Sequence, residues 1–331
     1  MEKKECRKRN KKKEKERQLV RILFFGTAGI SAVYLKALHK SSNEIFVVTM
    51  PDRPALRGHK LTAPAVKIYS AENNIKFIQP DKFTPEVVEE IRSFDADAGA
   101  VVAYGRFIPE ILFKLPKYKT FNIHFSLLPK YRGAAPVQYA LLNGETETGV
   151  TSFYIEKVLD AGSIIIQKKL CIQQTDNSRT LFDKIIPLGI ECMNETLELF
   201  SSSIISSRPQ TGCPSFAPAF KKEEGKIDWN RKVCDIYNQF RGLYIWPGIY
   251  SVVSKGKLSG KRIKFINIEI FDADSKNENF GTVVSIERNK GFVVSCSKGS
   301  ILVLKVQPDS KPVMSAWSFI QGGQLQTGDM F

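Results

Sequence analysis

The sequence predicts an α/β protein, in which a doubly wound, mostly parallel sheet is followed by a small, OB-like β-barrel. From about residue 20 to residue 200, apolar strand-like runs alternate with amphipathic helical patterns, which is typical of βαβ units. From about Glu223 onward, short β-rich runs are separated by turns such as Lys-Gly and Asn-Lys-Gly, which is typical of a barrel. The 331 residues suffice for two domains of ordinary size.

The first domain is predicted to open with a strand, a turn and a helix. Residues 20–25 form an apolar run, and the glycine turn at 26–29 leads into a helical pattern. The elements that follow are predicted strands at 45–49, 76–78, 98–103, 120–123, 150–155 and 163–169, and predicted helices at 63–73, 84–94 and 180–200. In such a sheet the active site lies at the carboxyl ends of the strands.

Composition suggests where the domains begin and end. Residues 1–19 are nearly all charged and lack an apolar stripe, so they predict a basic disordered tail, with a weak electrostatic arm for RNA as the alternative. Residues 20–205 form the predicted catalytic domain. Residues 206–222 continue a weakly periodic stretch rich in Ser and Pro and predict a surface linker. Residues 223–331 form the predicted barrel.

The charge of the chain points to a polyanionic partner. The formal net charge is +15, and nucleic acid is the usual partner of such a balance, with an anionic membrane surface second. Five basic residues cluster in one hairpin region of the predicted barrel: Lys255, Lys257, Lys261, Arg262 and Lys264. Individually they are interpreted as edge residues that block strand pairing. As a group they favour a surface for the RNA backbone.

Cysteine and histidine usage indicates the compartment and the chemistry. The six cysteines contain no CxxC pair, and the three histidines lie far apart, so neither a disulfide scaffold nor a metal site is predicted. No run approaches the roughly 18 apolar residues that span a bilayer. We therefore expect a cytoplasmic protein with no membrane partner and a metal-free mechanism. We also expect a monomer, although no sequence feature indicates the oligomeric state.

The segment 121–136, Phe-Asn-Ile-His-Phe-Ser-Leu-Leu-Pro-Lys-Tyr-Arg-Gly-Ala-Ala-Pro, is the most informative part of the sequence. Asn122 and His124 end an apolar run, and a Pro- and Gly-rich loop follows. Asp160 stands in a second loop, between the two predicted β segments at 150–155 and 163–169. One hydrogen-bond donor and two titratable groups make a set that can move protons. The alternative interpretation of His124 is a core histidine beside a capped turn.

The ordered pattern Asn-Ile-His, Ser-Leu-Leu-Pro, Tyr-Arg-Gly-Ala-Ala-Pro and Asp-x-Gly resembles the folate-dependent formyltransferases, and the resemblance covers the chain from about Arg21 onward. It implies a Rossmann-like catalytic domain and 10-formyltetrahydrofolate as the formyl donor. It also implies that Asn122, His124 and Asp160 are catalytic. It places Ser126, Leu127, Leu128 and Pro129 along the folate. It also implies a slot for the pterin near Arg106 and Ile108, where Arg106 either pairs with the negative tail of the folate or is an ordinary surface arginine.

A basic loop after the second predicted strand suggests which amine is formylated. The loop 50–61 resembles the Pro-Asp-Arg-Pro…Arg-Gly-Lys-Lys insertion of the family members that act on initiator methionyl-tRNA, with His59 in place of one lysine. In those members the insertion reaches the acceptor arm, which implies that Arg53, Arg57 and Lys60 bind tRNA. The runs 222–229 and Trp246-Pro247 also resemble that group.

Some features favour other members of the family. Ala161 replaces the usual threonine of Asp-Thr-Gly, and the run 143–149 is similar to formyltransferases that act on amino-sugar nucleotides. The Ala134-Ala135 pair, the basic loop and the basic barrel oppose that alternative. A glycinamide-ribonucleotide formyltransferase and a non-catalytic RNA-binding protein are further alternatives, and the complete catalytic set argues against the latter.

Overall fold

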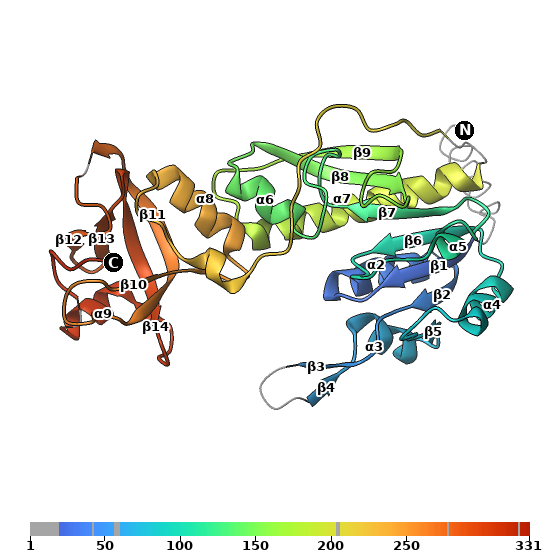
Figure 1. Cartoon of the computed structure of the whole chain (residues 1–331), viewed down its shortest axis with the longest axis horizontal. Coiled ribbons are helices and arrows are strands. Elements are labelled where there is room, and N and C mark those ends of the chain that lie inside the picture. Colours follow the sequence, from blue (N-terminus) through green and yellow to red (C-terminus); the bar gives the residue numbers. More distant parts are fainter. Residues whose placement is uncertain (1–19, 42, 56–59, 203–205, 277, 324) are drawn as a thin grey trace, which may run out of the picture. The chain divides into compact units, whose positions relative to one another are not determined.

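A computed structural model describes residues 20–331, apart from residues 42, 56–59, 203–205, 277 and 324 (Figure 1). The chain divides into two compact units. The sheet unit comprises the chain up to Arg132 together with Gly149–Leu170 and Ile185–Ser215. The C-terminal unit comprises Gly133–Thr148, Cys171–Lys184 and Phe216–Phe331. The basic tail predicted at 1–19 lies outside the described residues.

The sheet unit is built on a seven-stranded sheet with the strand order β5-β2-β1-β6-β7-β8-β9. Its strands are β1 (Arg21–Gly26), β2 (Glu44–Val48), β5 (Lys76–Ile78), β6 (Ala98–Val102), β7 (Thr120–His124), β8 (Glu147–Tyr154) and β9 (Ile164–Cys171). The pairs from β5 to β7 are parallel, and β8 pairs with β7 in the antiparallel sense. The strand order reverses between β1 and β6, so the predicted doubly wound sheet is confirmed.

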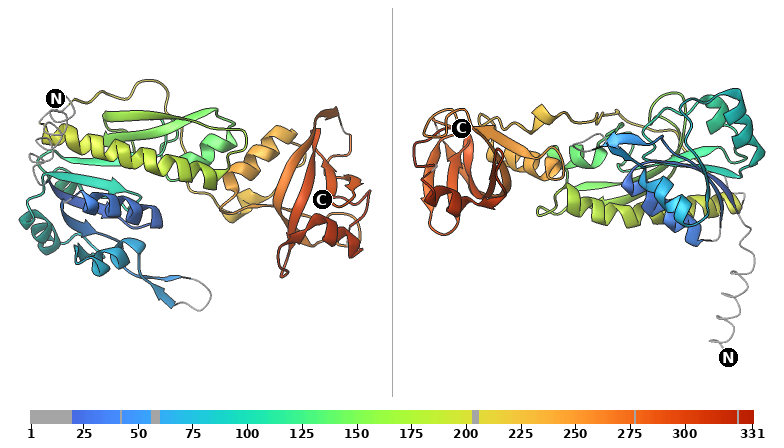
Figure 2. Two further views of the ribbon diagram at one scale, coloured as in Figure 1. Left: turned by 180° about the vertical axis from the view of Figure 1, so that it is seen from behind. Right: turned by 90° about the horizontal axis from the view of Figure 1, so that it is seen from below.

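Helices cover both faces of this sheet because its strands are apolar on both sides. The helices are α2 (Gly29–Lys40), α3 (Ala65–Glu72), α4 (Pro85–Ser93), α5 (Glu110–Phe113) and α7 (Ser178–Ser201). On one face, Phe25 and Phe46 share a core with Ile91 of α4 and Leu112 of α5. Helices α2 and α7 lie side by side (Figure 2), and the Tyr34 hydroxyl donates to the carbonyl oxygen of Ile186 at 3.2 Å.

A short ribbon interrupts the predicted basic loop. Strands β3 (Arg53–Ala55) and β4 (Lys60–Thr62) pair in the antiparallel sense, with Arg53 opposite Thr62. A three-residue strand that contains a proline gives only a weak strand pattern, so the sequence predicted a loop here.

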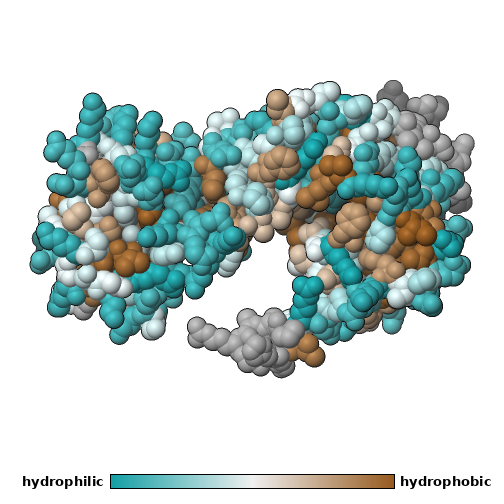
Figure 3. Space-filling model, viewed as in Figure 1, coloured by the Kyte–Doolittle hydropathy of each residue, from teal (hydrophilic) through white to brown (hydrophobic). Residues whose placement is uncertain are grey.

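On the face drawn in Figure 3, hydrophilic residues dominate and apolar residues form separate patches, as is usual for folded proteins.

The C-terminal unit contains an antiparallel sheet with the order β10-β11-β14-β13-β12, to which β15 adds beside β14. Its elements are α6 (Pro136–Leu142), η1 (Lys222–Gly225), α8 (Val233–Leu243), β10 (Ile249–Val252), β11 (Arg262–Lys276), β12 (Val283–Glu287), β13 (Gly291–Ser295), β14 (Lys298–Pro308), β15 (Met314–Ser315) and α9 (Ala316–Gln321). Met330 forms bridges to both Lys255 and Thr282, so it connects the two ends of this strand order. The sheet therefore curves back on itself as the predicted barrel requires.

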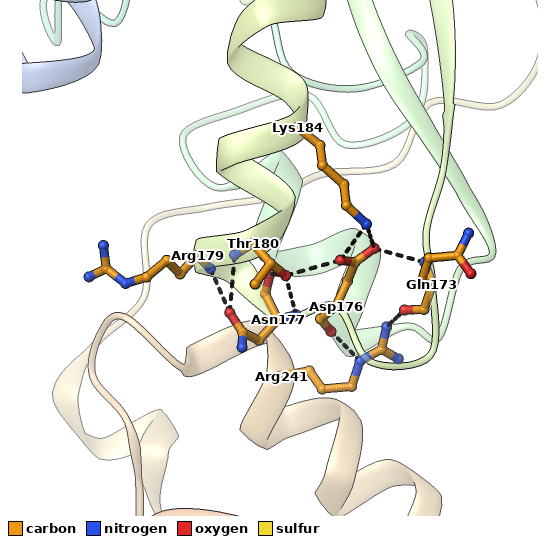
Figure 4. Close-up of polar contacts among 7 residues, drawn as sticks. All are labelled: Gln173, Asp176, Asn177, Arg179, Thr180, Lys184 and Arg241. Carbon is orange, nitrogen blue, oxygen red and sulfur yellow. Dashed lines mark hydrogen bonds and ion pairs between the residues drawn. The ribbon is translucent and has the colours of Figure 1, made fainter.

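Helix α8 is attached to the start of α7 by a buried arginine (Figure 4). Arg241 is only 7% exposed, and it donates from Nε to the carbonyl oxygen of Asp176 at 2.6 Å and from Nη2 to that of Gln173 at 2.8 Å. The Asp176 carboxylate accepts from Lys184 Nζ at 2.6 and 2.8 Å. The side chain of Asn177 accepts from the backbone N–H of Thr180 at 3.2 Å and so caps α7.

None of the helices in the described parts of the chain is long and apolar enough to cross a membrane.

Candidate active site

Two of the predicted catalytic residues lie on one strand of the sheet. Asn122 and His124 belong to β7, and because alternate residues of a strand point to the same face, their side chains share one face of the sheet. His124 is the last residue of β7, opposite Thr151 of β8, and it is 5% exposed. Asn122 is half-buried, so part of this residue is accessible from solvent. The alternation of side chains along β7 therefore places an amide and an imidazole on the same face of the sheet.

The ring of His124 is oriented by a hydrogen bond at Nε2 and by an aromatic contact. Its Nε2 atom lies 2.8 Å from the carbonyl oxygen of Tyr131, and since a carbonyl can only accept, Nε2 carries the proton. The ring packs edge-on against Phe153, with the ring centroids 6.3 Å apart. Tyr131 has a left-handed backbone, with φ of 62°, in the loop that follows β7. The loop thereby returns toward β7, where the Tyr131 carbonyl oxygen meets the His124 ring.

Asp160 approaches the other nitrogen of the same ring. Its Oδ2 atom lies 3.8 Å from His124 Nδ1, and both side chains are less than a tenth exposed. This distance exceeds that of a direct hydrogen bond. Asp160 has φ of 50°, and the turn also depends on Gly162, where an added Cβ would meet the carbonyl oxygen of Tyr154 at 1.8 Å. The glycine of the Asp-x-Gly pattern is therefore required by the close approach of two backbones.

The surroundings of His124 favour its neutral form. Burial lowers the pKa of the imidazole below its ordinary value, and this effect outweighs the Asp160 carboxylate and the Tyr131 carbonyl, which both raise it. With the proton on Nε2, the Nδ1 lone pair faces the Asp160 carboxylate. Two proton acceptors thus face each other across a gap of 3.8 Å.

The segment predicted to lie along the folate is held by buried hydrogen bonds. Ser126 Oγ donates to the carbonyl oxygen of Lys130 at 2.6 Å, and Thr151 Oγ1 donates to that of Ser126 at 2.7 Å. Leu128 is buried beside Phe153 and precedes a cis peptide bond to Pro129. Leu127 and Pro129 are half-buried. Contact between this segment and a folate stays a prediction, and the backbone with Leu127 and Pro129 is the part accessible to it.

The other predicted folate residues have different environments. Arg106 donates to the carbonyl oxygens of Pro80 at 3.1 Å and Asp81 at 2.5 Å, so a neighbouring loop fixes its guanidinium. Ile108 is 5% exposed and belongs to the core, whereas Phe107 beside it is 66% exposed. Contact of Arg106 and Ile108 with a folate stays a prediction, and of the two apolar side chains only Phe107 is accessible from solvent.

The predicted tRNA-binding residues are only partly described. Arg53 is exposed at the first position of β3. Arg57 and the side chain of Lys60 lie outside the described residues. Binding of tRNA by these three residues stays a prediction.

Polar side chains from another segment also reach the site. Gln210 Nε2 donates to the carbonyl oxygens of Asp160 and Gly162, at 2.8 and 2.9 Å. Arg132 in turn donates to Gln210 Oε1. Sequence reasoning missed Gln210 because it falls within the predicted linker. Among the residues that the structure describes, His, Cys, Asp and Glu do not form groups of three or more that could hold a metal, and the metal-free mechanism stays a prediction.

Comparison with known proteins identifies the family. Residues 20–197 match the formyl transferase family, and residues 219–324 match the formyl transferase C-terminal domain. The chain therefore belongs to the formyl transferase family, as its motifs led us to expect. Among its relatives, the methionyl-tRNA formyltransferase of Endomicrobium trichonymphae is 63% identical over 94% of this chain and 100% of that protein. The methionyl-tRNA formyltransferase of Thermodesulfovibrio yellowstonii is 38% identical over 93% of this chain and 97% of that protein.

Solved structures share the fold at lower identity. HypX from Aquifex aeolicus in complex with tetrahydrofolic acid is 17% identical with a TM-score of 0.62, and the match covers 93% of this chain and 48% of HypX. The chain thus spans about half the length of HypX. An N-formyltransferase from Helicobacter canadensis, in complex with folinic acid and dTDP-3-aminofucose, is 21% identical with a TM-score of 0.64 over 88% of this chain and 100% of that one.

Proposed function

We propose that this protein transfers the formyl group of 10-formyltetrahydrofolate to the α-amino group of methionine on initiator methionyl-tRNA, giving N-formylmethionyl-tRNA for translation initiation. Its membership of the formyl transferase family and its 63% identity to a methionyl-tRNA formyltransferase support this function. The observation that carries the chemistry is the His124–Asp160 pair, whose Nδ1 and Oδ2 atoms lie 3.8 Å apart next to the strand position of Asn122.

The reaction begins when the neutral methionine amine attacks the formyl carbon. A bond forms between the amine nitrogen and this carbon, and the carbonyl electron pair moves to the formyl oxygen. Asn122 stabilises this developing negative charge by donating a hydrogen bond from its side-chain amide, which is the role of an oxyanion-hole donor. Because the strand fixes the Asn122 backbone, little reorganisation is needed at the moment of reaction.

The proton of the attacking amine must then reach N10 of the folate. His124 Nδ1 is an acceptor because Nε2 keeps its proton on the Tyr131 carbonyl. The imidazolium that forms is stabilised by the Asp160 carboxylate across the 3.8 Å gap. His124 returns the proton to N10, the bond between N10 and the formyl carbon breaks, and tetrahydrofolate leaves as a neutral amine. The pair thus moves one proton without forming a covalent intermediate with the enzyme.

Recognition of tRNA, rather than of a small amine, depends on charge. The net charge of +15 suits a partner with many phosphates. Arg53 is exposed on the β3–β4 ribbon, so this ribbon can present positive charge to an RNA stem. An amino-sugar nucleotide is the second candidate substrate because Ala161 follows Asp160 as in formyltransferases for such sugars. Such a ligand carries few phosphates, so it could pair with only a small part of the net positive charge of the protein.

The test offers the two amines to the same enzyme. The protein is incubated with 10-formyltetrahydrofolate and with initiator methionyl-tRNA, uncharged initiator tRNA or a dTDP-linked amino sugar, and formylated product is measured. We expect product with the charged tRNA alone. Product with the amino sugar and none with methionyl-tRNA would overturn the proposed substrate. A reaction mixture that lacks the protein serves as the control for uncatalysed formylation.

A further inference from the structure

The segment that follows α7 runs beside the loop that carries Asp160. Arg208 and Ile164 exchange two backbone hydrogen bonds, Ile164 N–H to the Arg208 carbonyl at 2.8 Å and Arg208 N–H to the Ile164 carbonyl at 2.9 Å. Ile164 is the first residue of β9, directly after the Asp160 loop. The segment predicted to be a linker is therefore bonded to the first residue of β9 by an isolated antiparallel β-bridge, directly after the Asp160 loop. Gln210 lies two residues beyond this bridge, on the side of Asp160.

The side chain of Gln210 forms hydrogen bonds to the backbone of the turn that contains Asp160. Its Nε2 atom donates to the carbonyl oxygen of Asp160 at 2.8 Å and to that of Gly162 at 2.9 Å. Both N–H bonds of one amide group are thus directed to the two ends of the Asp-Ala-Gly turn. Since carbonyl oxygens can only accept, the orientation of the Gln210 amide follows from these bonds. The turn is held by a side chain that is fifty positions away in sequence.

Arg132 holds the other end of the same amide. It donates from Nε and Nη2 to Gln210 Oε1, at 3.2 and 2.7 Å. A guanidinium has donors only, so it requires the oxygen of Gln210 on its side and the nitrogen on the side of Asp160. A hydrogen bond from a charged donor is also roughly twice as strong as a neutral one. Arg132 follows Tyr131, the residue whose carbonyl oxygen faces His124, so one turn supports both halves of the pair.

The Asp160 turn needs such support. Asp160 has φ of 50°, a left-handed conformation that most residues with a side chain avoid and that Asp adopts more readily than most. The three residues before it, Lys157, Val158 and Leu159, are exposed. Strained backbone persists only where surrounding groups determine it. The two bonds from Gln210 are therefore suited to keep the Asp160 carboxylate at its distance from His124.

We infer that Gln210, oriented by Arg132, is a positioning residue for the reaction: it fixes the backbone of Asp160 and so places the carboxylate against His124. This inference rests on the proposed function, because it assumes that Asp160 takes part in proton transfer. Gln210 itself contacts neither the imidazole nor the Asp160 carboxylate in the bonds described. Its contribution should therefore vanish once the Asp160 carboxylate is gone.

A double-mutant cycle tests this dependence. Gln210→Ala is compared with the unmodified protein, and Gln210→Ala/Asp160→Asn with Asp160→Asn alone. We expect Gln210→Ala to lower kcat roughly 10- to 100-fold, the scale of a misplacement of about 1 Å, with KM for both substrates unchanged. In the Asp160→Asn background the same change should have no further effect on kcat. Circular dichroism and thermal melting of each variant establish that the fold is retained.

A matched control is present in the C-terminal unit. Gln239 is buried and donates from Nε2 to the carbonyl oxygens of Glu224 and Lys226, at 2.8 and 3.1 Å, so it makes the same pair of bonds elsewhere. Gln239→Ala should change kcat by the same small factor with and without the Asp160 carboxylate. As a second variant, Arg132→Met frees the Gln210 amide to rotate and should lower kcat only while Gln210 is present.

The possible results separate the two proposals. Multiplicative effects of Gln210→Ala and Asp160→Asn would overturn the positioning role, since Gln210 would then act independently of the carboxylate. An unchanged kcat in Gln210→Ala, beside an impaired Asp160→Asn, would also overturn it while leaving the proposed catalytic set intact. Full activity in Asp160→Asn would overturn both the assignment of Asp160 and the role of Gln210.

Discussion

His124 donates from Nε2 to the carbonyl oxygen of Tyr131 at 2.8 Å, and this bond decides which nitrogen of the ring is chemically available. The carbonyl is itself held in place, because the backbone N–H of Tyr131 donates to Ser215 Oγ at 2.9 Å. The N–H of Arg132 donates to the Ser215 carbonyl at 2.8 Å. The peptide unit that selects the tautomer is therefore fixed from the segment that also contains Gln210. Nδ1 is left to face Asp160.

Removal of either member of the His124–Asp160 pair should abolish proton transfer. We expect His124→Ala and Asp160→Ala each to lower kcat roughly 10²–10⁴-fold, the usual contribution of a positioned acid or base. The double variant should be little worse than either single variant, because the two groups act together. Single-turnover formylation measures the rate, and tRNA binding should be nearly unchanged. Turnover near that of the unmodified protein in both single variants would remove the proposed active site.

Asn122 should contribute by donating a hydrogen bond, and two substitutions isolate that property. Asn122→Ala removes the donor, and the loss of one oxyanion-hole donor lowers kcat roughly 10²–10³-fold. Asn122→Asp keeps the shape but replaces the donor with an acceptor that repels the developing oxyanion, so we expect a loss at least as large. The two variants are compared by kcat at saturating substrates. An active Asn122→Asp protein would contradict the role of donor.

The pH dependence of kcat should report the buried imidazole. His124 acts as a base only when neutral, so the rate rises with pH through its pKa. Because burial lowers this pKa below the ordinary value of 6.5, the acidic limb should lie below pH 6.5. The Asp160 carboxylate raises the pKa of His124, so Asp160→Asn should move the limb to still lower pH. A limb that stays in place in Asp160→Asn would show that another group titrates there.

The basic loop should act on tRNA affinity alone. Arg57→Ala/Lys60→Ala should flatten the slope of log affinity against log salt by about one to two units, on a scale calibrated with DNA at about 0.9 per phosphate contact. KM for methionyl-tRNA should rise while KM for the folate stays the same. Lys36→Ala/Lys40→Ala removes the same charge from exposed positions of α2 and serves as the control. An unaltered slope and KM would assign the RNA contacts to other residues.

Arg241 should matter for stability rather than for chemistry. Arg241→Met leaves the carbonyl oxygens of Asp176 and Gln173 without their donor, and each unsatisfied buried group costs roughly 1–3 kcal/mol. We expect the free energy of unfolding, measured with urea, to fall by roughly 2–6 kcal/mol for the two groups together. Arg179→Met is the matched control, because this exposed side chain points away from the cluster in Figure 4. Equal losses in the two variants would contradict the role given to Arg241.

Strong periodic patterns made most of the sheet predictable. The run predicted at 98–103 forms β6 and the run at 120–123 forms β7, because continuous apolar segments bounded by turns suit strands buried on both faces. Because side chains alternate along a strand, the sequence predicted that Asn122 and His124 lie on the same face. The resemblance to a known family implied that Asp160 belongs to the same site. By contrast, α8 was missed inside the region expected to be β-rich. Val233, Ile236, Phe240 and Leu243 are all buried with helical spacing, so a signal was present.

The supporting contacts could not be derived from local sequence. Gln210 stands in a weakly periodic stretch, and its partners Asp160 and Arg132 are 50 and 78 positions away. Nothing in a single sequence tells which polar residue of a long connection folds against which loop. The same holds for Ser215, which is 84 positions from Tyr131. The reactive groups were therefore predictable, while the groups that orient them required the folded chain.

The segment beyond α7 also bears on the order in which the active site is completed during synthesis of the chain. The ribosome releases β7 and the Asp160 loop long before Gln210 and Ser215, which stand near the last residue of the sheet unit. The nascent chain can thus form its strands while the imidazole and the carboxylate are still loosely oriented. A chain that ended with α7 would contain Asn122, His124 and Asp160. It would lack the hydrogen bonds of Gln210 and Ser215 that orient the Asp160 turn and the Tyr131 backbone.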